Sequence, residues 1–251
     1  SDRNFICYQH LFIWIFRIRR FSNARVGQYR TFVMEISARA IRRILTWSWI
    51  GPINSNDSND SNDSKDSQKK YWSSMSILIL ASGSGTLAQA LIDSQFDIKA
   101  IVSDVADAEV LNRGKRAGIP TQVISFRQPR EEWNKELFEY VAKIDPDLVV
   151  SVGFMRLLAP DFVRRFRVIN SHPALLPNFP GAHAVRDALA AKATETGCTV
   201  HWVDEGMDTG EIIAQQSIAI EPDDDLASLH ERIKILERKL IVKVVKELEG
   251  R

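Results

Sequence analysis

From Met75 onward, short apolar runs typical of buried strands alternate with longer segments of helical periodicity. Runs such as residues 77–80 and 148–150 are apolar at every position, as expected for strands buried on both faces. This alternation is the pattern of a mainly parallel sheet with helices on both of its faces. We therefore expect residues 75–251 to form a single doubly wound α/β domain with a mostly parallel sheet.

Periodicity and breaker residues place the individual elements of this domain. We expect strands at residues 76–81, 98–103, 121–124, 148–152, 168–170, 198–203 and 212–220. We expect helices at residues 86–94, 108–117, 131–144, 160–165, 184–192 and 226–248, with the aspartates at 223–225 capping the last of them.

The chain before Met75 has a different composition. Residues 1–53 form a basic, aromatic extension, and the first fifty of them hold nine arginines and two acids. Such a segment is typical of a transit peptide, or of translated sequence upstream of the true start. Residues 54–74 include a repeated Asn-Asp-Ser triplet and almost no apolar side chain, so we expect a disordered linker.

Charge and cysteine content exclude several classes of protein. Residues 1–74 hold twelve basic and six acidic side chains, so subtraction from the totals of 33 and 32 leaves 21 and 26 in residues 75–251. The resulting net charge of −5 argues against a nucleic-acid-binding domain. The longest apolar run, residues 11–16, is much shorter than the roughly 20 residues that span a bilayer.

Cys7 and Cys198 show no metal-binding or disulfide spacing, which favours a reducing, cytoplasmic compartment. The arginines of the extension leave open a membrane-binding or nucleic-acid-binding role. Neither an amphipathic helix nor a basic stripe is evident in that segment, so we expect neither partner.

A turn of small residues, 81–86, joins the first expected strand to the first expected helix. Gly83, Ser84, Gly85 and Thr86 would let backbone N–H groups close around a phosphate at the positive end of the helix. The turn lacks the third glycine of a dinucleotide fingerprint and the lysine of a P-loop. The alternative is a tight strand-to-helix turn with Thr86 as the N-cap.

Asn170 and His172 lie two residues apart at the end of a buried strand. If the chain is still extended there, their side chains face the same side of the sheet. Ligands bind at the carboxyl edge of open α/β sheets, and Pro173 and Pro177 stiffen the loop that follows. The alternative is that Asn170 caps a turn and His172 is buried in the core.

An acidic, glycine-containing loop, residues 204–210, lies between the last two expected strands. The carboxylate of Asp208 could approach an imidazole there, and it would raise the pKa of that imidazole and keep it protonated. The alternative is an ordinary solvated hairpin loop.

Taken together, four ordered motifs resemble those of the folate-dependent formyltransferases. They are residues 81–86, 153–158, 170–177, and 197–204 continuing to 208–210, and the resemblance extends from Met75 to Glu249. It is greatest to the branch that formylates glycinamide ribonucleotide in purine synthesis. The resemblance implies a Rossmann-like formyltransferase fold, 10-formyltetrahydrofolate as co-substrate, no metal, and a monomer or homodimer.

The resemblance also implies catalytic roles. The substrate amine attacks the formyl carbon, and Asn170 and protonated His172 donate hydrogen bonds to the resulting oxyanion. Such donors typically contribute roughly 3–4 kcal/mol each. Asp208 holds His172 charged and helps to remove the amine proton, in a step of the kind that typically contributes about 10²–10⁴-fold in rate.

The resemblance also implies a set of substrate-binding residues. The phosphate site comprises Gly83, Ser84, Gly85, Thr86 and Leu87, the last standing where some members have asparagine. The folate site comprises Met155, Arg156, Leu157, Leu158, Asn170, Asp204 and Asp208, with Arg130 at the glutamate tail. Glu237 binds the ribose, unless it is a surface glutamate, and Arg130 could equally be an exposed loop residue. Glu211 stands where the family often has proline, which puts the rigidity of the loop in question.

Three alternatives remain besides the glycinamide ribonucleotide enzyme. A formyltetrahydrofolate deformylase has no nucleotide phosphate to bind and would have a folded regulatory domain first. A methionyl-tRNA formyltransferase would need a further C-terminal domain. A non-catalytic nucleotide- or folate-binding module would have no need of all three of Asn170, His172 and Asp208. We assign no primary role to His183 or His201.

Overall fold

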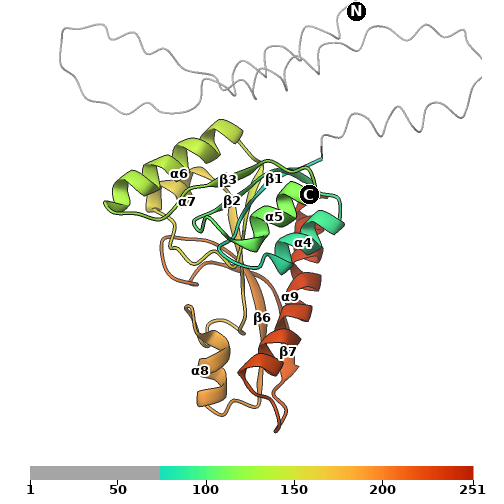
Figure 1. Ribbon diagram of the computed structural model, residues 1–251. Coiled ribbons are helices and arrows are strands. Elements are labelled where there is room, and N and C mark those ends of the chain that lie inside the picture. Colours follow the sequence, from blue (N-terminus) through green and yellow to red (C-terminus); the bar gives the residue numbers. More distant parts are fainter. Residues whose placement is uncertain (1–73, 251) are drawn as a thin grey trace, which may run out of the picture. The chain divides into compact units, whose positions relative to one another are not determined.

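The computed structural model describes residues 74–250, and it contains one seven-stranded sheet with the order β3-β2-β1-β4-β5-β6-β7 (Figure 1). The strands are β1 (Ser76–Leu80), β2 (Asp97–Ser103), β3 (Thr121–Val123), β4 (Leu148–Val152), β5 (Val168–His172), β6 (Glu195–Trp202) and β7 (Ile212–Ala219). Neighbouring strands from β3 to β5 are parallel, while β6 and β7 are antiparallel to their neighbours. The predicted doubly wound, mostly parallel α/β fold is confirmed.

Helices cover both faces of this sheet, as Figure 1 shows. They are α4 (Thr86–Asp93), α5 (Glu109–Arg116), α6 (Arg130–Ile144), α7 (Pro160–Arg165), α8 (Ala184–Ala190) and α9 (Leu226–Glu249). One apolar core joins the sheet to α4, α5, α8 and α9, and a second joins it to α6 and α7. Every predicted strand and helix is present within a few residues of its expected bounds.

Strand β5 is longer than predicted and carries both Asn170 and His172. Ser171 and His172 still pair with β6, opposite Val200 and Thr199, so the strand extends two residues beyond its predicted end at Asn170. His172 is therefore the last residue of a strand and only 4% exposed. Because side chains alternate along a strand, Asn170 and His172 face one side of the sheet and Ser171 faces the other.

The N-termini of α9 and α4 are capped in different ways. Asp225 caps α9 through a capping box with Ser228, which confirms the predicted role of the aspartates there. The cap of α4 is Gly85, in the left-handed conformation with φ 68°, and Thr86 is the first helical residue. The predicted alternative of Thr86 as N-cap is therefore wrong.

The predictions for residues 1–53 and for the linker lie outside the described residues, apart from Ser74. Within residues 74–250, no helix combines the length and the apolar character needed to cross a membrane.

Candidate active site

The predicted catalytic side chains meet on the face of β5 that carries Asn170 and His172. Strand β6 runs antiparallel to β5 and ends beside Ile169, but the loop after it folds back over this face. Oδ2 of Asp208 lies 3.4 Å from Nδ1 of His172, and Oδ1 of Asp208 lies 3.5 Å from Nε2 of His201. The structure thus brings Asn170, His172 and Asp208 together and adds His201 to them.

Asp208 has a left-handed backbone conformation, with φ 56°, and hydrogen bonds hold its carboxylate in place. The Gly181 N–H donates to its Oδ2 at 2.8 Å. Burial alone would raise the pKa of the Asp208 carboxyl, but its contact with His201, this hydrogen bond from Gly181 and the proximity of His172 bring the pKa below the ordinary value. Asp208 therefore remains ionised at neutral pH.

Asp204 closes the loop that presents Asp208. The Thr209 hydroxyl donates to the Asp204 carboxylate at 2.8 Å, and the Gly206 N–H donates to it at 3.0 Å. The backbone of Glu211, which replaces the family's frequent proline, accepts from the Trp202 N–H at 2.9 Å. These bonds supply an ordered loop without proline.

Both ring nitrogens of His172 face oxygen atoms. Nε2 lies 2.8 Å from the Phe179 carbonyl oxygen, and since a carbonyl only accepts, Nε2 carries a proton. Burial lowers the pKa of His172 more than Asp208 and the Phe179 carbonyl raise it, so the pKa lies below its ordinary value. The prediction that Asp208 holds His172 protonated is therefore wrong for the unliganded protein, in which the ring is neutral at pH 7.

Glu237 lies on α9, behind β5 and away from the catalytic face. The Ser171 hydroxyl donates to its Oε1 at 2.8 Å, and the glutamate is 5% exposed. Burial raises the pKa of Glu237 to about 7. The alternative of a surface glutamate is wrong, and the two faces of one strand place Glu237 and the catalytic residues on opposite sides of the sheet.

The predicted phosphate turn leaves part of its backbone open. Gly83 and Ser84 are exposed, while Gly85 packs against Val110 so closely that a Cβ atom would lie 2.5 Å from the Val110 side chain. Arg113, which sequence reasoning missed, donates from Nε to the Ser84 carbonyl at 2.7 Å. Arg113 lies on α5, far from the turn in sequence, so nothing in the sequence indicated that its charge would lie at the turn.

Thr86 and Leu87 differ in their access to this turn. Thr86 is half-buried at the start of α4. The side chain of Leu87 is 9% exposed and belongs to the apolar core, because its position on α4 faces the sheet. Its side chain offers no hydrogen bond to a phosphate, as expected for leucine at a position where some members have asparagine, and a contact through its backbone N–H stays a prediction.

The predicted folate wall, residues 153–158, follows β4. Met155 and Leu157 are 62% and 51% exposed, and Arg130 donates to the Leu157 carbonyl oxygen at 2.8 Å. Exposed apolar side chains of this size fit an apolar ligand surface, and they follow β4, the parallel neighbour of the catalytic strand β5. Leu158 is instead half-buried and packs against the core on the α6 side, so it lies partly behind this surface.

Arg156 and Ser82 connect the folate wall to the phosphate turn. The Arg156 guanidinium donates to Asp104 at 2.7 Å and lies 4.2 Å from the centre of the Phe126 ring. Ser82 donates to the same Asp104 and accepts from the Met155 N–H at 2.9 Å. The Arg156 side chain is thus held by the protein itself.

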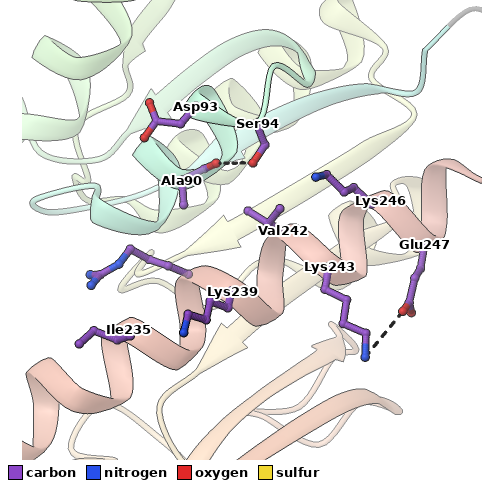
Figure 2. Close-up of a pocket in the computed structure, with 10 residues that line it drawn as sticks. Ala90, Asp93, Ser94, Ile235, Lys239, Val242, Lys243, Lys246 and Glu247 are labelled. Atoms are coloured by element: carbon purple, nitrogen blue, oxygen red, sulfur yellow. Dashed lines mark hydrogen bonds and ion pairs between the residues drawn. The ribbon is translucent and has the colours of Figure 1, made fainter.

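A separate open groove of about 700 Å³ lies between α4 and α9 (Figure 2). None of the predicted site residues lines it; the lining residues are Ala90, Asp93, Ser94, Ile235, Arg238, Lys239, Val242, Lys243, Lys246 and Glu247. The candidate active site is therefore defined by the catalytic edge of the sheet and not by this groove.

Burial raises the pKa of the Cys198 thiol to about 12, so this thiol is not a nucleophile at neutral pH. Among residues 74–250, no group of three or more His, Cys, Asp or Glu side chains could hold a metal ion.

Comparisons with known proteins show which proteins this chain is similar to. Residues 75–245 match the family model described as formyl transferase. A phosphoribosylglycinamide formyltransferase of Mycobacterium tuberculosis is 44% identical over 180 residues, which are 68% of this chain and 84% of the relative. The human trifunctional purine biosynthetic protein adenosine-3 is 39% identical over 176 residues, 65% of this chain and 17% of that protein.

Solved structures show the same likeness. The crystal structure of phosphoribosylglycinamide formyltransferase from Bacillus halodurans superposes with a TM-score of 0.67 at 37% identity, covering 69% of this chain and 94% of that one. The corresponding structure from Streptococcus pneumoniae gives a TM-score of 0.66 at 35% identity, covering 69% of this chain and 98% of that one.

Proposed function

The chain belongs to the formyl transferase family, and on that premise we propose that it transfers the formyl group of 10-formyltetrahydrofolate to the amine of glycinamide ribonucleotide. This is a one-carbon transfer in purine biosynthesis. The observation that carries the proposal is the meeting of an amide, an imidazole and an ionised carboxylate at Asn170, His172 and Asp208, in a chain 44% identical to a phosphoribosylglycinamide formyltransferase.

The reaction needs no covalent enzyme intermediate. The lone pair of the substrate amine forms a bond to the formyl carbon, and the carbonyl electron pair moves to oxygen. When the oxyanion collapses, the bond to N10 of the folate breaks and N10 takes a proton, while the new amide nitrogen loses one. The enzyme must therefore stabilise an oxyanion and move a proton from one nitrogen to the other.

Asn170 donates to the oxyanion through the side-chain N–H that its protein partners leave free. His172 donates through Nε2, which already carries a proton; this N–H exchanges the Phe179 carbonyl for the oxyanion when substrate is bound. A preorganised donor of this kind contributes roughly 3–4 kcal/mol. His172 performs this role as a neutral imidazole.

Asp208 takes part in the proton transfer. Its carboxylate is ionised in the free protein and lies beside Nδ1 of His172, the nitrogen that lacks a proton. The proton lost by the attacking amine passes to this pair, directly or through water, and from there to N10. Asp208 also binds the folate, together with Asp204.

Two surfaces on either side of this centre bind the substrates. The backbone of Gly83, Ser84, Gly85 and Thr86 holds the phosphate, assisted by the charge of Arg113. Met155 and Leu157 cover the pterin, with the backbone of Arg156 beside them. Arg130 meets the glutamate tail, and Glu237, whose carboxyl accepts a hydrogen bond from Ser171 in the free protein, binds the ribose hydroxyls.

The decisive experiment is the dependence of folate consumption on the acceptor. The full chain is incubated with 10-formyltetrahydrofolate, with and without glycinamide ribonucleotide, and tetrahydrofolate formation is followed by absorbance. We expect turnover only with the ribonucleotide, and a fall in kcat of about 10²–10³-fold in Asn170→Ala. Turnover without an acceptor would identify a deformylase, and no turnover in either case would contradict catalysis.

The domain division is also a proposal: the catalytic domain begins at Met75. A chain that starts at Met75 should keep the kcat and KM values of the full chain. Loss of activity or of solubility on truncation would show that residues 1–74 are required. A cytoplasmic location and a monomeric or homodimeric state remain predictions.

A further inference from the structure

Ser151 places a hydroxyl group in a strand that is otherwise apolar. All five residues of β4 (Leu148–Val152) are buried, and Ser151 is 6% exposed. A buried hydroxyl without a partner would cost about 1–3 kcal/mol. A small apolar residue would fill this position without that free-energy cost. The partner of the hydroxyl is therefore a guide to why a serine is present.

The partner of Ser151 is the catalytic amide. Strands β4 and β5 are parallel neighbours, and Ser151 stands opposite Asn170 in their register. The Ser151 hydroxyl donates to Oδ1 of Asn170 at 2.8 Å. This contact involves the end of the amide that does not stabilise an oxyanion.

His201 holds the other end of the same amide. Nδ1 of His201 lies 2.8 Å from the Trp202 carbonyl oxygen, and since a carbonyl only accepts, Nδ1 carries a proton and Nε2 is left as the acceptor. Nδ2 of Asn170 lies 3.3 Å from this Nε2. One N–H of Asn170 is thereby engaged, and the second remains for the substrate.

Each of these two contacts has a different effect on Asn170. The acceptor on His201 decides which end of the amide is nitrogen, since a reversed amide would place Oδ1 against the lone pair of Nε2. The contact with Ser151 fixes the plane of the amide, because with the His201 contact alone the amide could still rotate about that hydrogen bond. Accepting a hydrogen bond at Oδ1 also polarises the amide and strengthens its N–H as a donor.

We propose that Ser151 is a positioning residue for formyl transfer, which acts through Asn170 by fixing the plane of its amide and aiming the free N–H at the formyl oxygen. The expected effect of Ser151 on kcat rests on the proposed function. The hydrogen-bond geometry on which the positioning role is built does not depend on the identity of the acceptor.

The test uses the full chain with Ser151→Ala, which removes the hydroxyl and nothing else. Removing an oxyanion donor costs about 10²–10³ in kcat, so we expect a donor that is only misdirected to cost about tenfold. The KM values of both substrates should change less than about twofold, because Ser151 acts on the transition state alone. Ser151→Thr keeps a hydroxyl at the same position and should retain kcat within the same twofold.

Ser76→Ala is the matched control. Its hydroxyl also donates a 2.8 Å hydrogen bond from a strand residue, to Asp147, but at the opposite end of the sheet. We expect this variant to keep the kcat of the wild type. If Ser76→Ala lost as much kcat as Ser151→Ala, or if Ser151→Thr were as slow as Ser151→Ala, the loss would be one of general stability and the proposal would be overturned.

A double-mutant cycle then asks whether Ser151 acts through Asn170. In an Asn170→Ala background, Ser151→Ala should cost less than about twofold, because the amide that it positions is already gone. A full tenfold loss in that background would overturn the proposal, as would an unchanged kcat for Ser151→Ala alone.

A readout without activity separates this proposal from the proposed function. The side-chain NH₂ group of Asn170 is observed by ¹⁵N NMR and assigned by its absence in Asn170→Ala. We expect two well-separated proton resonances in the wild type that approach one another in Ser151→Ala as the amide rotates. If the wild type does not formylate glycinamide ribonucleotide, the proposed function is refuted, but this spectrum still tests whether Ser151 positions Asn170. Unchanged resonances in Ser151→Ala would refute the role of Ser151.

Discussion

Nδ1 of His172 lies 3.4 Å from Oδ2 of Asp208, while Nε2 of the same ring donates to the Phe179 carbonyl oxygen. The proton on Nε2 is therefore set by the backbone, and only the proton on Nδ1 depends on pH. Burial opposes that second proton and the charge of Asp208 favours it. The Asp208 carboxylate thus raises the pKa of His172, which burial alone would lower still further.

Asp208→Asn should lower the pKa of His172 below its wild-type value, because the attraction is lost and the burial remains. NMR titration of the imidazole carbon-bound protons measures this shift, with His230, whose own burial lowers its pKa, as the internal control. We expect kcat to fall by about 10²-fold or more, as proton transfer typically contributes 10²–10⁴. An unchanged His172 titration would show that Asp208 does not act on the ring.

Glu237→Gln should stabilise the unliganded protein above pH 7. The pKa of Glu237 is about 7 in the folded protein against 4.5 for the ordinary group, so the folded state holds a proton that the unfolded state has lost. Stability therefore falls as pH rises from about 4.5 to 7, by roughly 3 kcal/mol in all. The glutamine side chain cannot ionise and escapes this loss.

Urea unfolding of both proteins at pH 5 and pH 8 measures this difference. The gain of Glu237→Gln over the wild type should be small at pH 5 and approach about 3 kcal/mol at pH 8. The exposed Glu139 on α6 supplies the control, since Glu139→Gln should behave alike at both pH values. Equal gains for Glu237→Gln at pH 5 and pH 8 would argue against a buried, ionising carboxyl.

The fold could be predicted from sequence because its signals are local. Apolar runs such as residues 77–80 mark strands buried on both faces, and each is followed by a segment of helical period. The catalytic set was likewise accessible, since Asn170 and His172 share one strand and Asp208 lies in a recognisable acidic loop. Their meeting required only that the loop after β6 fold back over β5.

Other features depend on tertiary contacts and left no local signal. Ser151 looks like a tolerated small residue until the register of β4 and β5 sets it opposite Asn170. Glu237 sits in a helix rich in charge, and only the packing of α9 on the sheet shows it to be buried. The charge state of His172 was predicted wrongly because the sequence reveals the nearby carboxylate but not the degree of burial.

Met155→Ser should weaken folate binding without affecting the fold. Met155 is 62% exposed in the free protein, so the substitution should change the free energy of unfolding by less than about 0.5 kcal/mol. Losing part of the apolar contact with the pterin should raise the KM for 10-formyltetrahydrofolate about tenfold, which corresponds to roughly 1.4 kcal/mol. Steady-state kinetics at saturating ribonucleotide measures the change.

Ile235→Ser is the control for Met155→Ser. Ile235 is 43% exposed and lines the groove between α4 and α9, away from the catalytic residues. Its substitution should leave the KM for the folate unchanged. A similar increase in both variants would mean that the effect is not specific to the wall that follows β4.

The two glycines of the phosphate turn should respond differently to alanine. Gly85 has φ 68°, and a Cβ atom there would lie 2.5 Å from the Val110 side chain and 2.9 Å from its Cα. The left-handed conformation alone costs alanine about 1–2 kcal/mol, and the contact with Val110 adds to it. Gly85→Ala should therefore lower the free energy of unfolding by at least that amount, as measured by urea denaturation.

Gly83→Ala separates ligand binding from folding at the same turn. A Cβ atom at Gly83 has no neighbour within 4 Å, so the free energy of unfolding should not change measurably. If the turn binds the phosphate through its backbone, the added methyl group enters that space and displaces a charge-assisted hydrogen bond, which contributes about 1.5–3 kcal/mol. The KM for glycinamide ribonucleotide should then rise about tenfold or more while the KM for the folate stays constant. A Gly83→Ala enzyme with unchanged kinetics would place the phosphate elsewhere.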